Sequence, residues 1–270
     1  MDISVVILSF NSAKFIEKCL SSLTSSLKQS ERDFEIFVVD NGSKDGTLEI
    51  LSRIEGELEG RLTSILLSHN TGTTYSRNQA LKQAKGKYIL VLDSDAYMNE
   101  PALTGLSQYL DEHPNCGMAV PRVTYGSGNY QLSCDTFPTL WKKFQRFLFL
   151  KNMEEQESDL SKATVPVNVD YAISACWMLK RETLEKVGLL DEKIFYSPED
   201  VDYCLRVWEA GYVITYVPSV SVIHDAQELS RGFKLTKFHF SHLKGLFYLM
   251  YKHKYFWGLS SLYKRLGKDT

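Results

Sequence analysis

The amino-acid sequence predicts an α/β fold with a mostly parallel central sheet flanked by helices. Three observations carry this prediction: strand and helix patterns alternate over residues 1–92, the strand patterns are almost continuously apolar, and a polar cluster follows three of them. Continuous apolar runs are typical of strands covered on both faces. Alternating strands and helices imply parallel pairing through right-handed crossovers.

The first elements are predicted from these patterns in chain order. Residues 3–10 form a β-branched and apolar run, and residues 13–27 carry apolar side chains at helical spacing. The same two patterns then repeat along the chain. The further expected elements are a strand at 34–39, a helix from 47, a strand at 62–67, a helix at 74–84 and a strand at 87–92.

The pattern loosens after Pro101, although strands and helices continue. A helix is expected over 102–112, a strand over 118–123, and mixed strand and helix signals over 166–216. Residues 141–150 are rich in aromatic and basic side chains, and the polar, acidic stretch 153–161 predicts a mobile loop.

Composition and cysteine use favour an ordinary globular protein in a reducing compartment. Hydrophobic residues make up 44% and charged residues 24% of the chain. The five cysteines are scattered and form no CxxC pair, which argues against a disulfide framework or a zinc site. The amino terminus lacks a signal-peptide pattern, and no apolar run approaches the roughly 20 residues of a membrane span. We therefore expect a cytosolic protein, at most attached to a membrane surface.

Three polar clusters, Ser9–Asn11, Asp40–Ser43 and Asp93–Asp95, follow strands of the predicted sheet. Ligands bind beyond the carboxyl ends of the strands in such sheets, so the clusters predict one site at that edge. Asp93 and Asp95 can meet one divalent cation if the chain turns there, and their oxygens suit Mg²⁺ or Mn²⁺. The alternative is a turn aspartate followed by a helix cap.

Acidic residues also open a later helix, in the sequence Ser197-Pro198-Glu199-Asp200-Val201-Asp202. Ser197 fits an N-cap, Pro198 the first helical position and Asp200 the third, which would complete a capping box. Alternatively, one of these carboxylates is a general base, if burial and a neighbouring acid raise its pKa. The sequence leaves both interpretations open.

Two basic residues are candidates for the same site. His224 follows an apolar strand, where it is either a structural histidine or a third metal ligand. Arg77 lies early in a helix after Asn70-Thr71-Gly72, where it either faces a diphosphate or belongs to a solvated helix face.

These segments together resemble the family 2 inverting glycosyltransferases, which have the GT-A fold. The resemblance spans about residues 3–225. The matching segments are VVILSFN (5–11), VVDNGSKDGT (38–47), the segment 70–81 with RNQAL, GKYILVLDSDA (86–96), ACWMLKRETLEKVGLLDE (175–192), FYSPEDVDYCLRVWEAGY (195–212) and His224.

The resemblance implies a role for each candidate residue. The donor side is implied to consist of a nucleoside pocket with Ser9, Asn11 and Asp40, with Asn70 and Ser94 beside the nucleotide-sugar and Arg77 near its diphosphate. Asp95 and His224 would bind the metal, and Asp93 the ribose or a metal-bound water. Asp200 would be the catalytic base, Glu199 would orient the acceptor, and Asp202 and Trp177 would support acceptor binding.

The implied reaction is a single displacement at the anomeric carbon of a nucleotide-diphosphate sugar, with inversion of configuration. Residues 224–231, HDAQELSR, resemble the region after the metal histidine in bacterial rhamnosyltransferases, which use dTDP-rhamnose to build surface polysaccharides on lipid-linked intermediates. Gly232 departs from the paired basic residues expected there. UDP-hexoses are therefore competing donors.

The chain is expected to divide into a catalytic domain, residues 1–230, and a basic, aromatic helical extension, residues 231–270. The extension carries nine Lys or Arg residues and one acid, whereas the rest of the chain is acidic overall. Apolar positions at Phe240, Leu243, Phe247, Met250 and Tyr251 follow helical spacing. Such a helix can lie in an anionic membrane surface, here the inner face of a bacterial cell membrane. The alternative is a helical hairpin that packs on the catalytic domain or on another subunit of a homo-oligomer.

Three other functions compete with glycosyl transfer. A nucleotidyltransferase normally needs a glycine-rich, basic loop after the first strand, where this chain has SFNSA. A catalytically silent carbohydrate-binding protein need not retain every acidic position of the site. Nucleic-acid binding would use the basic extension, but the acidic body argues against it.

Overall fold

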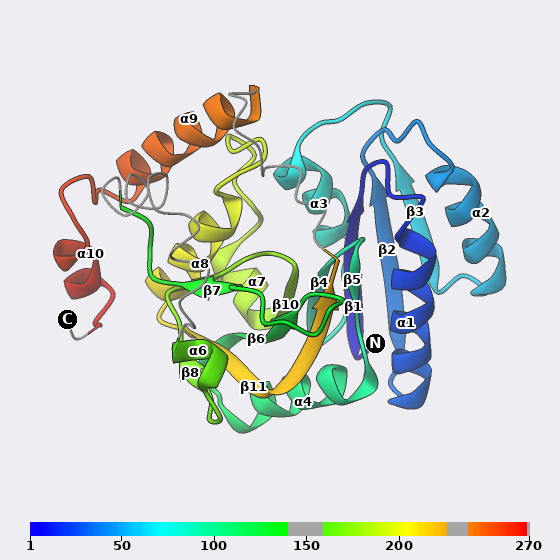
Figure 1. The fold of residues 1–270 in the computed structure, drawn as a ribbon, viewed down its shortest axis with the longest axis horizontal. Coiled ribbons are helices and arrows are strands. Elements are labelled where there is room, and N and C mark those ends of the chain that lie inside the picture. The colour runs from blue at the N-terminus through cyan, green and yellow to red at the C-terminus, as the bar shows by residue number, and fades with distance from the viewer. Residues whose placement is uncertain (140–158, 226–236, 269–270) are drawn as a thin grey trace.

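The computed structural model describes residues 1–139, 159–225 and 237–268, with side chains in the last segment described from residue 243 onward (Figure 1). The aromatic segment 141–150, most of the predicted loop 153–161, and residues 226–231 of the rhamnosyltransferase-like motif lie outside these ranges. The elements are, in order, β1 (Ile3–Ser9), α1 (Ile16–Gln29), β2 (Phe34–Asp40), α2 (Thr47–Glu57), β3 (Leu62–Leu66), α3 (Thr73–Leu81), β4 (Tyr88–Asp93), β5 (Ala96–Tyr97), α4 (Glu100–Glu112), β6 (Cys116–Thr124), β7 (Cys134–Asp135), α6 (Asp159–Lys162), β8 (Val167–Asn168), β9 (Tyr171–Ala172), β10 (Cys176–Lys180), α7 (Arg181–Val187), α8 (Glu199–Glu209), β11 (Val213–His224), α9 (Lys237–Lys252) and α10 (Ser260–Arg265).

The central sheet is mostly parallel, as the sequence predicts. Its strand order is β3-β2-β1-β4-β10-β6-β11-β5, with β8 paired to β11. Strands β1 to β4 pair in parallel, and so do β6 and β11, whereas β10 runs antiparallel between β4 and β6. Every element predicted between residues 3 and 92 is present, with ends shifted by a few residues.

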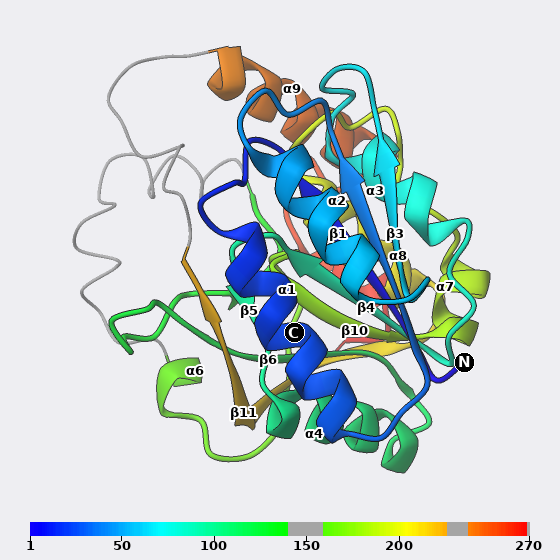
Figure 2. The same cartoon turned by 90° about the vertical axis from the view of Figure 1, so that its right-hand side faces the viewer.

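Helices cover both faces of this sheet. Helices α1, α2 and α4 bury their apolar residues on one face, while α3, α7, α8 and the C-terminal helices cover the other (Figure 1, Figure 2). Strand β1 serves both layers, because Val5 and Ile7 point to the first face and Val6 to the second. Each fully buried aliphatic side chain of this kind contributes about 1.5–3 kcal/mol of transfer free energy.

Helix α9 packs on the body of the protein with part of the predicted apolar stripe. Met250 is buried, together with Leu246 and Leu249, whereas Leu243, Phe247 and Tyr251 are exposed. The neighbouring α10 is anchored at Asp170, which accepts hydrogen bonds from Tyr263 and Lys268. Within the described residues, no helix combines the length and the apolarity needed to cross a bilayer.

The capping box predicted at Ser197 is wrong. Helix α8 begins at Glu199, so Pro198 occupies the N-cap position and no side chain caps the helix. Ser197 lies one residue before that position, so it is not the N-cap residue.

Candidate active site

The three polar clusters predicted from the sequence meet at one edge of the sheet. In the parallel register of β1 with its neighbours, Ser9 pairs with Asp40 and Leu8 pairs with Asp93. Because the three strands end side by side, their terminal side chains face a common space beyond the sheet. The three clusters therefore meet at this edge, as the sequence predicts.

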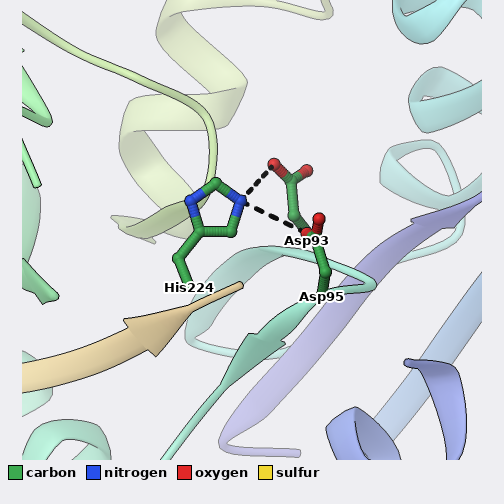
Figure 3. A group of neighbouring side chains, drawn as sticks. All are labelled: Asp93, Asp95 and His224. Carbon is green, nitrogen blue, oxygen red and sulfur yellow. Dashed lines mark ion pairs between the residues drawn. The ribbon is translucent and has the colours of Figure 1, made fainter. Parts of the chain in front are cut away.

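The pairing of two strands brings a histidine into that space. The short strand β5 runs antiparallel to the end of β11, so His224 lies opposite Ala96, and the amide of Asp225 donates to the carbonyl of Asp95 at 2.9 Å. The His224 Nε2 atom is 3.2 Å from Asp95 Oδ1 and 3.8 Å from Asp93 Oδ2 (Figure 3). One ligand atom from each of the three residues lies within 4.8 Å of the others.

The donor set and its supporting hydrogen bond fit a divalent cation. The His224 Nδ1 atom is 2.9 Å from the side-chain oxygen of Gln131. An amide oxygen only accepts, so the Nδ1–H group donates to Gln131. The Nε2–H group of the charged ring donates to Asp95, and loss of that proton would free Nε2 to bind a cation. Burial lowers the pKa of His224, but the hydrogen bond to Asp95 and the charges of Asp93 and Asp95 outweigh it and raise the pKa overall. A proton and a cation therefore compete for Nε2.

Arg77 is the buried centre of the site and belongs to no solvated helix face. Its side chain is 2% exposed. One guanidinium nitrogen donates to Asp93 Oδ1 at 2.5 Å, and another donates to Ser174 Oγ at 2.7 Å and lies 3.6 Å from Glu199 Oε1. The guanidinium of Arg77 thus joins α3 to the end of β4 and to the start of α8.

Glu199 and Asp200 line a pocket of about 230 Å³ together with Arg77, Asp93 and Ser174. Ser174 donates to Glu199 Oε1 at 3.2 Å. Burial, followed by the charge of Asp200, raises the pKa of Glu199 to about 8, although Arg77 opposes the shift. Burial therefore favours the neutral form of Glu199, whereas Asp200 is only half-buried at the pocket wall.

Two of the three residues predicted to bind the nucleoside, Asn11 and Asp40, are held by side-chain hydrogen bonds to loop residues. Asp40 is buried and accepts from the amide and hydroxyl of Ser43. The side chain of Asn11 accepts from the amide of Lys44, and the backbone of Asn11 has a positive φ of 51°. The hydroxyl of Ser9 is buried without a hydrogen-bond partner among the described residues.

Asn70 and Ser94 are placed in the same way. Asn70 accepts from the side chain of Asn41 and from the amide of Gly72. Ser94 shares a 2.8 Å hydrogen bond with Ser12, the residue after the first polar cluster. Both residues therefore belong to the loops at the site's edge.

Two predicted acceptor residues lie outside the pocket. Trp177 is 1% exposed, stacks on Tyr203 and donates to the carbonyl of Ala172, so it belongs to the core. Asp202 is also 1% exposed and faces α9, where it accepts from Lys252 and His253. Their burial leaves no side-chain surface for an acceptor.

Gln131 and Ser174 hydrogen-bond to His224 and Arg77, and no sequence pattern marks either of them. A larger groove of about 580 Å³ lies at the opposite, amino-terminal edge of the sheet, between residues 27–34 and 57–61. It is lined by charged surface side chains and lacks the strand-end cluster described above.

Comparisons with known proteins agree with this architecture. The model of the family "Glycosyl transferase family 2" matches residues 4–188. Glycosyltransferase AglE of Haloferax volcanii is 28% identical over 83% of this chain and 67% of its own length. The dTDP-rhamnosyl transferase RfbF of Shigella flexneri is 24% identical over 77% of this chain and 64% of its own.

Solved structures show the same fold. The mannosyltransferase PcManGT from Pyrobaculum calidifontis, in complex with GDP-Man and Mn²⁺, has a TM-score of 0.62 at 20% identity, over 93% of this chain and 63% of its own. S. aureus TarS 1-349 in complex with UDP-GlcNAc has a TM-score of 0.55 at 23% identity, over 87% of this chain and 62% of its own. The chain thus spans about two thirds or less of these four proteins, and its fold is GT-A.

Replacing Gln131 with Leu is expected to weaken Mn²⁺ binding by about 10- to 100-fold, because His224 loses the partner that fixes its tautomer. Titration calorimetry with MnCl₂ measures the effect. Gln108→Leu, on the exposed face of α4, is the matched control and should bind Mn²⁺ like the unchanged chain. Equal affinities for both variants would remove Gln131 from the metal site.

Replacing Glu199 with Gln is expected to raise the melting temperature at high pH but not near pH 4.5. A carboxyl with a raised folded-state pKa stabilises the fold below its ordinary pKa, and this contribution is lost as pH rises toward about 8. The neutral amide avoids that loss, so the difference between variant and parent should grow by a few degrees over this window. Melting curves from pH 4.5 to 8.5 measure it, with the exposed Glu112→Gln as control. A constant difference across the range would contradict the buried, protonated Glu199.

Proposed function

The chain belongs to glycosyl transferase family 2, and on that premise we propose that it moves a sugar from a nucleotide-diphosphate donor to a hydroxyl of a saccharide acceptor, with inversion. The observation that carries the proposal is the convergence of Asp93, Asp95 and His224 beside the pocket of Arg77, Glu199 and Asp200. This arrangement places a candidate site for a divalent cation beside two carboxyl groups, of which Glu199 is buried and Asp200 half-buried.

The donor side is assigned to the ends of β1, β2 and β4. Ser9, Asn11 and Asp40 are proposed to line the nucleoside pocket, with Asn70 and Ser94 beside it. Arg77 is proposed to stabilise the diphosphate chiefly by holding Asp93, since its guanidinium is already paired there. Mn²⁺ or Mg²⁺, held by Asp95 and His224 with Asp93 nearby, would supply the positive charge that a departing diphosphate needs.

The acceptor side is assigned to Glu199 and Asp200. Asp200 is proposed to take the proton of the acceptor hydroxyl as the oxygen attacks the anomeric carbon, while the bond from that carbon to the diphosphate oxygen breaks. Glu199 is proposed to hold the acceptor as a hydrogen-bond donor, because its raised pKa keeps it protonated at neutral pH. One displacement of this kind inverts the configuration without a glycosyl-enzyme intermediate.

For the donor we propose dTDP-rhamnose, with UDP-hexoses as the competing class. The rhamnosyl assignment is supported by the HDAQELSR segment and by the similarity to RfbF over 77% of this chain. The UDP alternative is supported by the UDP-GlcNAc complex of TarS, a structure that shares the fold.

We propose that the acceptor is carried on a lipid at the inner face of a bacterial membrane. The support is an exposed apolar surface, mostly aromatic, formed by Leu243, Phe247, Tyr251, Phe256 and Trp257, the last of these fully exposed. Tyr251, Phe256 and Trp257 line one groove together with Lys252 and Lys254. Basic and aromatic side chains in this combination suit an anionic lipid surface.

Asp200→Asn is expected to reduce sugar transfer by about 10²- to 10⁴-fold while nucleotide binding is retained. Asp95→Asn should instead abolish the Mn²⁺-dependent gain in melting temperature on adding dTDP- or UDP-sugars. Thermal shifts against a panel of both nucleotide families, together with release of nucleoside diphosphate, separate the two effects. A folded Asp200→Asn variant that binds no nucleotide would overturn the base assignment, and a parent chain stabilised by none of the panel would overturn the donor class.

The triple substitution Phe247→Ser, Tyr251→Ser and Trp257→Ser is expected to remove binding to vesicles of phosphatidylglycerol and phosphatidylethanolamine. Flotation measures the bound fraction, with neutral phosphatidylcholine vesicles for comparison. A chain with Leu66→Ser and Tyr75→Ser, which changes exposed apolar residues elsewhere, is the control. Equal bound fractions for the two variants would contradict the proposed membrane binding.

A further inference from the structure

Helix α9 touches the backbone that leads directly into the proposed catalytic acids. A Cβ atom on Gly245 would lie 2.3 Å from the carbonyl oxygen of Ser197 and 2.8 Å from Pro198 Cδ. Glycine is unfavourable inside a helix, so its presence here points to a packing requirement. Only a residue without a side chain lets α9 approach Ser197 and Pro198 this closely.

The same side of α9 makes polar contacts with the segment before α8. The hydroxyl of Tyr248 donates to Asp191 Oδ2 at 2.8 Å, and Lys252 Nζ lies 2.7 Å from the same atom. Positions 245, 248 and 252 follow helical spacing and so lie along one face. This face therefore runs against both ends of the loop between Asp191 and Pro198.

A third contact fixes α8 itself, one turn after Glu199. Lys252 Nζ and His253 Nε2 lie 2.6 Å and 2.9 Å from Asp202 Oδ1, while Arg206 Nε donates to Oδ2 at 3.0 Å. Burial raises the pKa of Asp202, but the hydrogen bond from His253 and the charges of Arg206 and Lys252 outweigh it and lower the pKa to about 2. The charged form of Asp202 is thus held from the C-terminal side.

We propose that Gly245 and Asp202 are positioning residues through which α9 sets the place of Glu199 and Asp200 relative to the bound donor. The inference rests on the proposed glycosyl transfer, in which Asp200 takes the acceptor proton. Helix α9 lies above α8 in Figure 1. Its apolar residues Leu243, Phe247 and Tyr251 are exposed, and Gly245 faces the loop. The contacts made by Gly245, Tyr248, Lys252 and His253 of this C-terminal segment therefore reach the proposed acceptor half of the site through Asp191, Ser197, Pro198 and Asp202.

The test compares Gly245→Ala with Gly56→Ala. Gly56 is also inside a helix, α2, but a Cβ atom there would meet nothing within 4 Å. Hydrogen exchange of the full chain should show faster exchange over residues 195–203 in Gly245→Ala alone, with no change at the ends of β1, β2 and β4. With whichever dTDP- or UDP-sugar stabilises the parent, kcat should fall about 10- to 100-fold while the Kd for the nucleotide in Mn²⁺ stays within about twofold.

Tyr248→Phe gives a milder second variant, with the exposed Tyr251→Phe as its control. It removes only the hydroxyl that donates to Asp191 and should shift exchange in the same segment by a smaller amount. Unchanged exchange over 195–203, or faster exchange spread evenly over the protein, would overturn the positioning role. A parent chain that binds no nucleotide-sugar would defeat the proposed function, and the exchange comparison would still decide whether α9 holds this segment.

Discussion

The arrangement of the site depends on one buried arginine, Arg77, whose guanidinium lies between two carboxyl groups. Arg77 reaches Asp93 on one side and Ser174 and Glu199 on the other, and almost none of its surface is exposed. Without the guanidinium, two acidic groups would remain in a poorly solvated space with little to compensate them. The arginine thereby joins the proposed metal half of the site to the proposed acceptor half. Burial raises the pKa of both Asp93 and Glu199, and the charge of Arg77 opposes both shifts.

The meeting of the three polar clusters could be predicted from the sequence because it follows from regular structure. Parallel strands end at one edge of a sheet, so residues after consecutive apolar runs must meet, as Ser9, Asp40 and Asp93 do. His224 was only a candidate, since its place depends on β5, a strand of two residues with no recognisable pattern. Gln131 and Ser174 lie outside the long helices and strands, and nothing in their neighbourhood distinguishes them from other polar residues.

The acceptor half was harder to predict because distant packing decides it. The acids at the start of α8 look alike in sequence, yet Asp200 lines the pocket while Asp202 is held by Lys252 and His253, about fifty residues later in the chain. Strand β10 lies between β4 and β6 and is buried on both faces. The ring of Trp177 therefore enters the core on one face of the sheet. The predicted apolar stripe of the C-terminal helix likewise divides into a buried part and an exposed part once α9 packs on the body.

The central claim is that Asp95 and His224 hold a divalent cation beside a nucleotide diphosphate. Anomalous diffraction at the manganese edge, from crystals of the full chain grown with Mn²⁺ and either UDP or dTDP, measures this most directly. The account predicts one strong peak about 2.0–2.2 Å from Asp95 and from His224 Nε2, in contact with the diphosphate. A bound nucleotide whose diphosphate carries Mn²⁺ away from both residues, or no peak at saturating Mn²⁺, would contradict it.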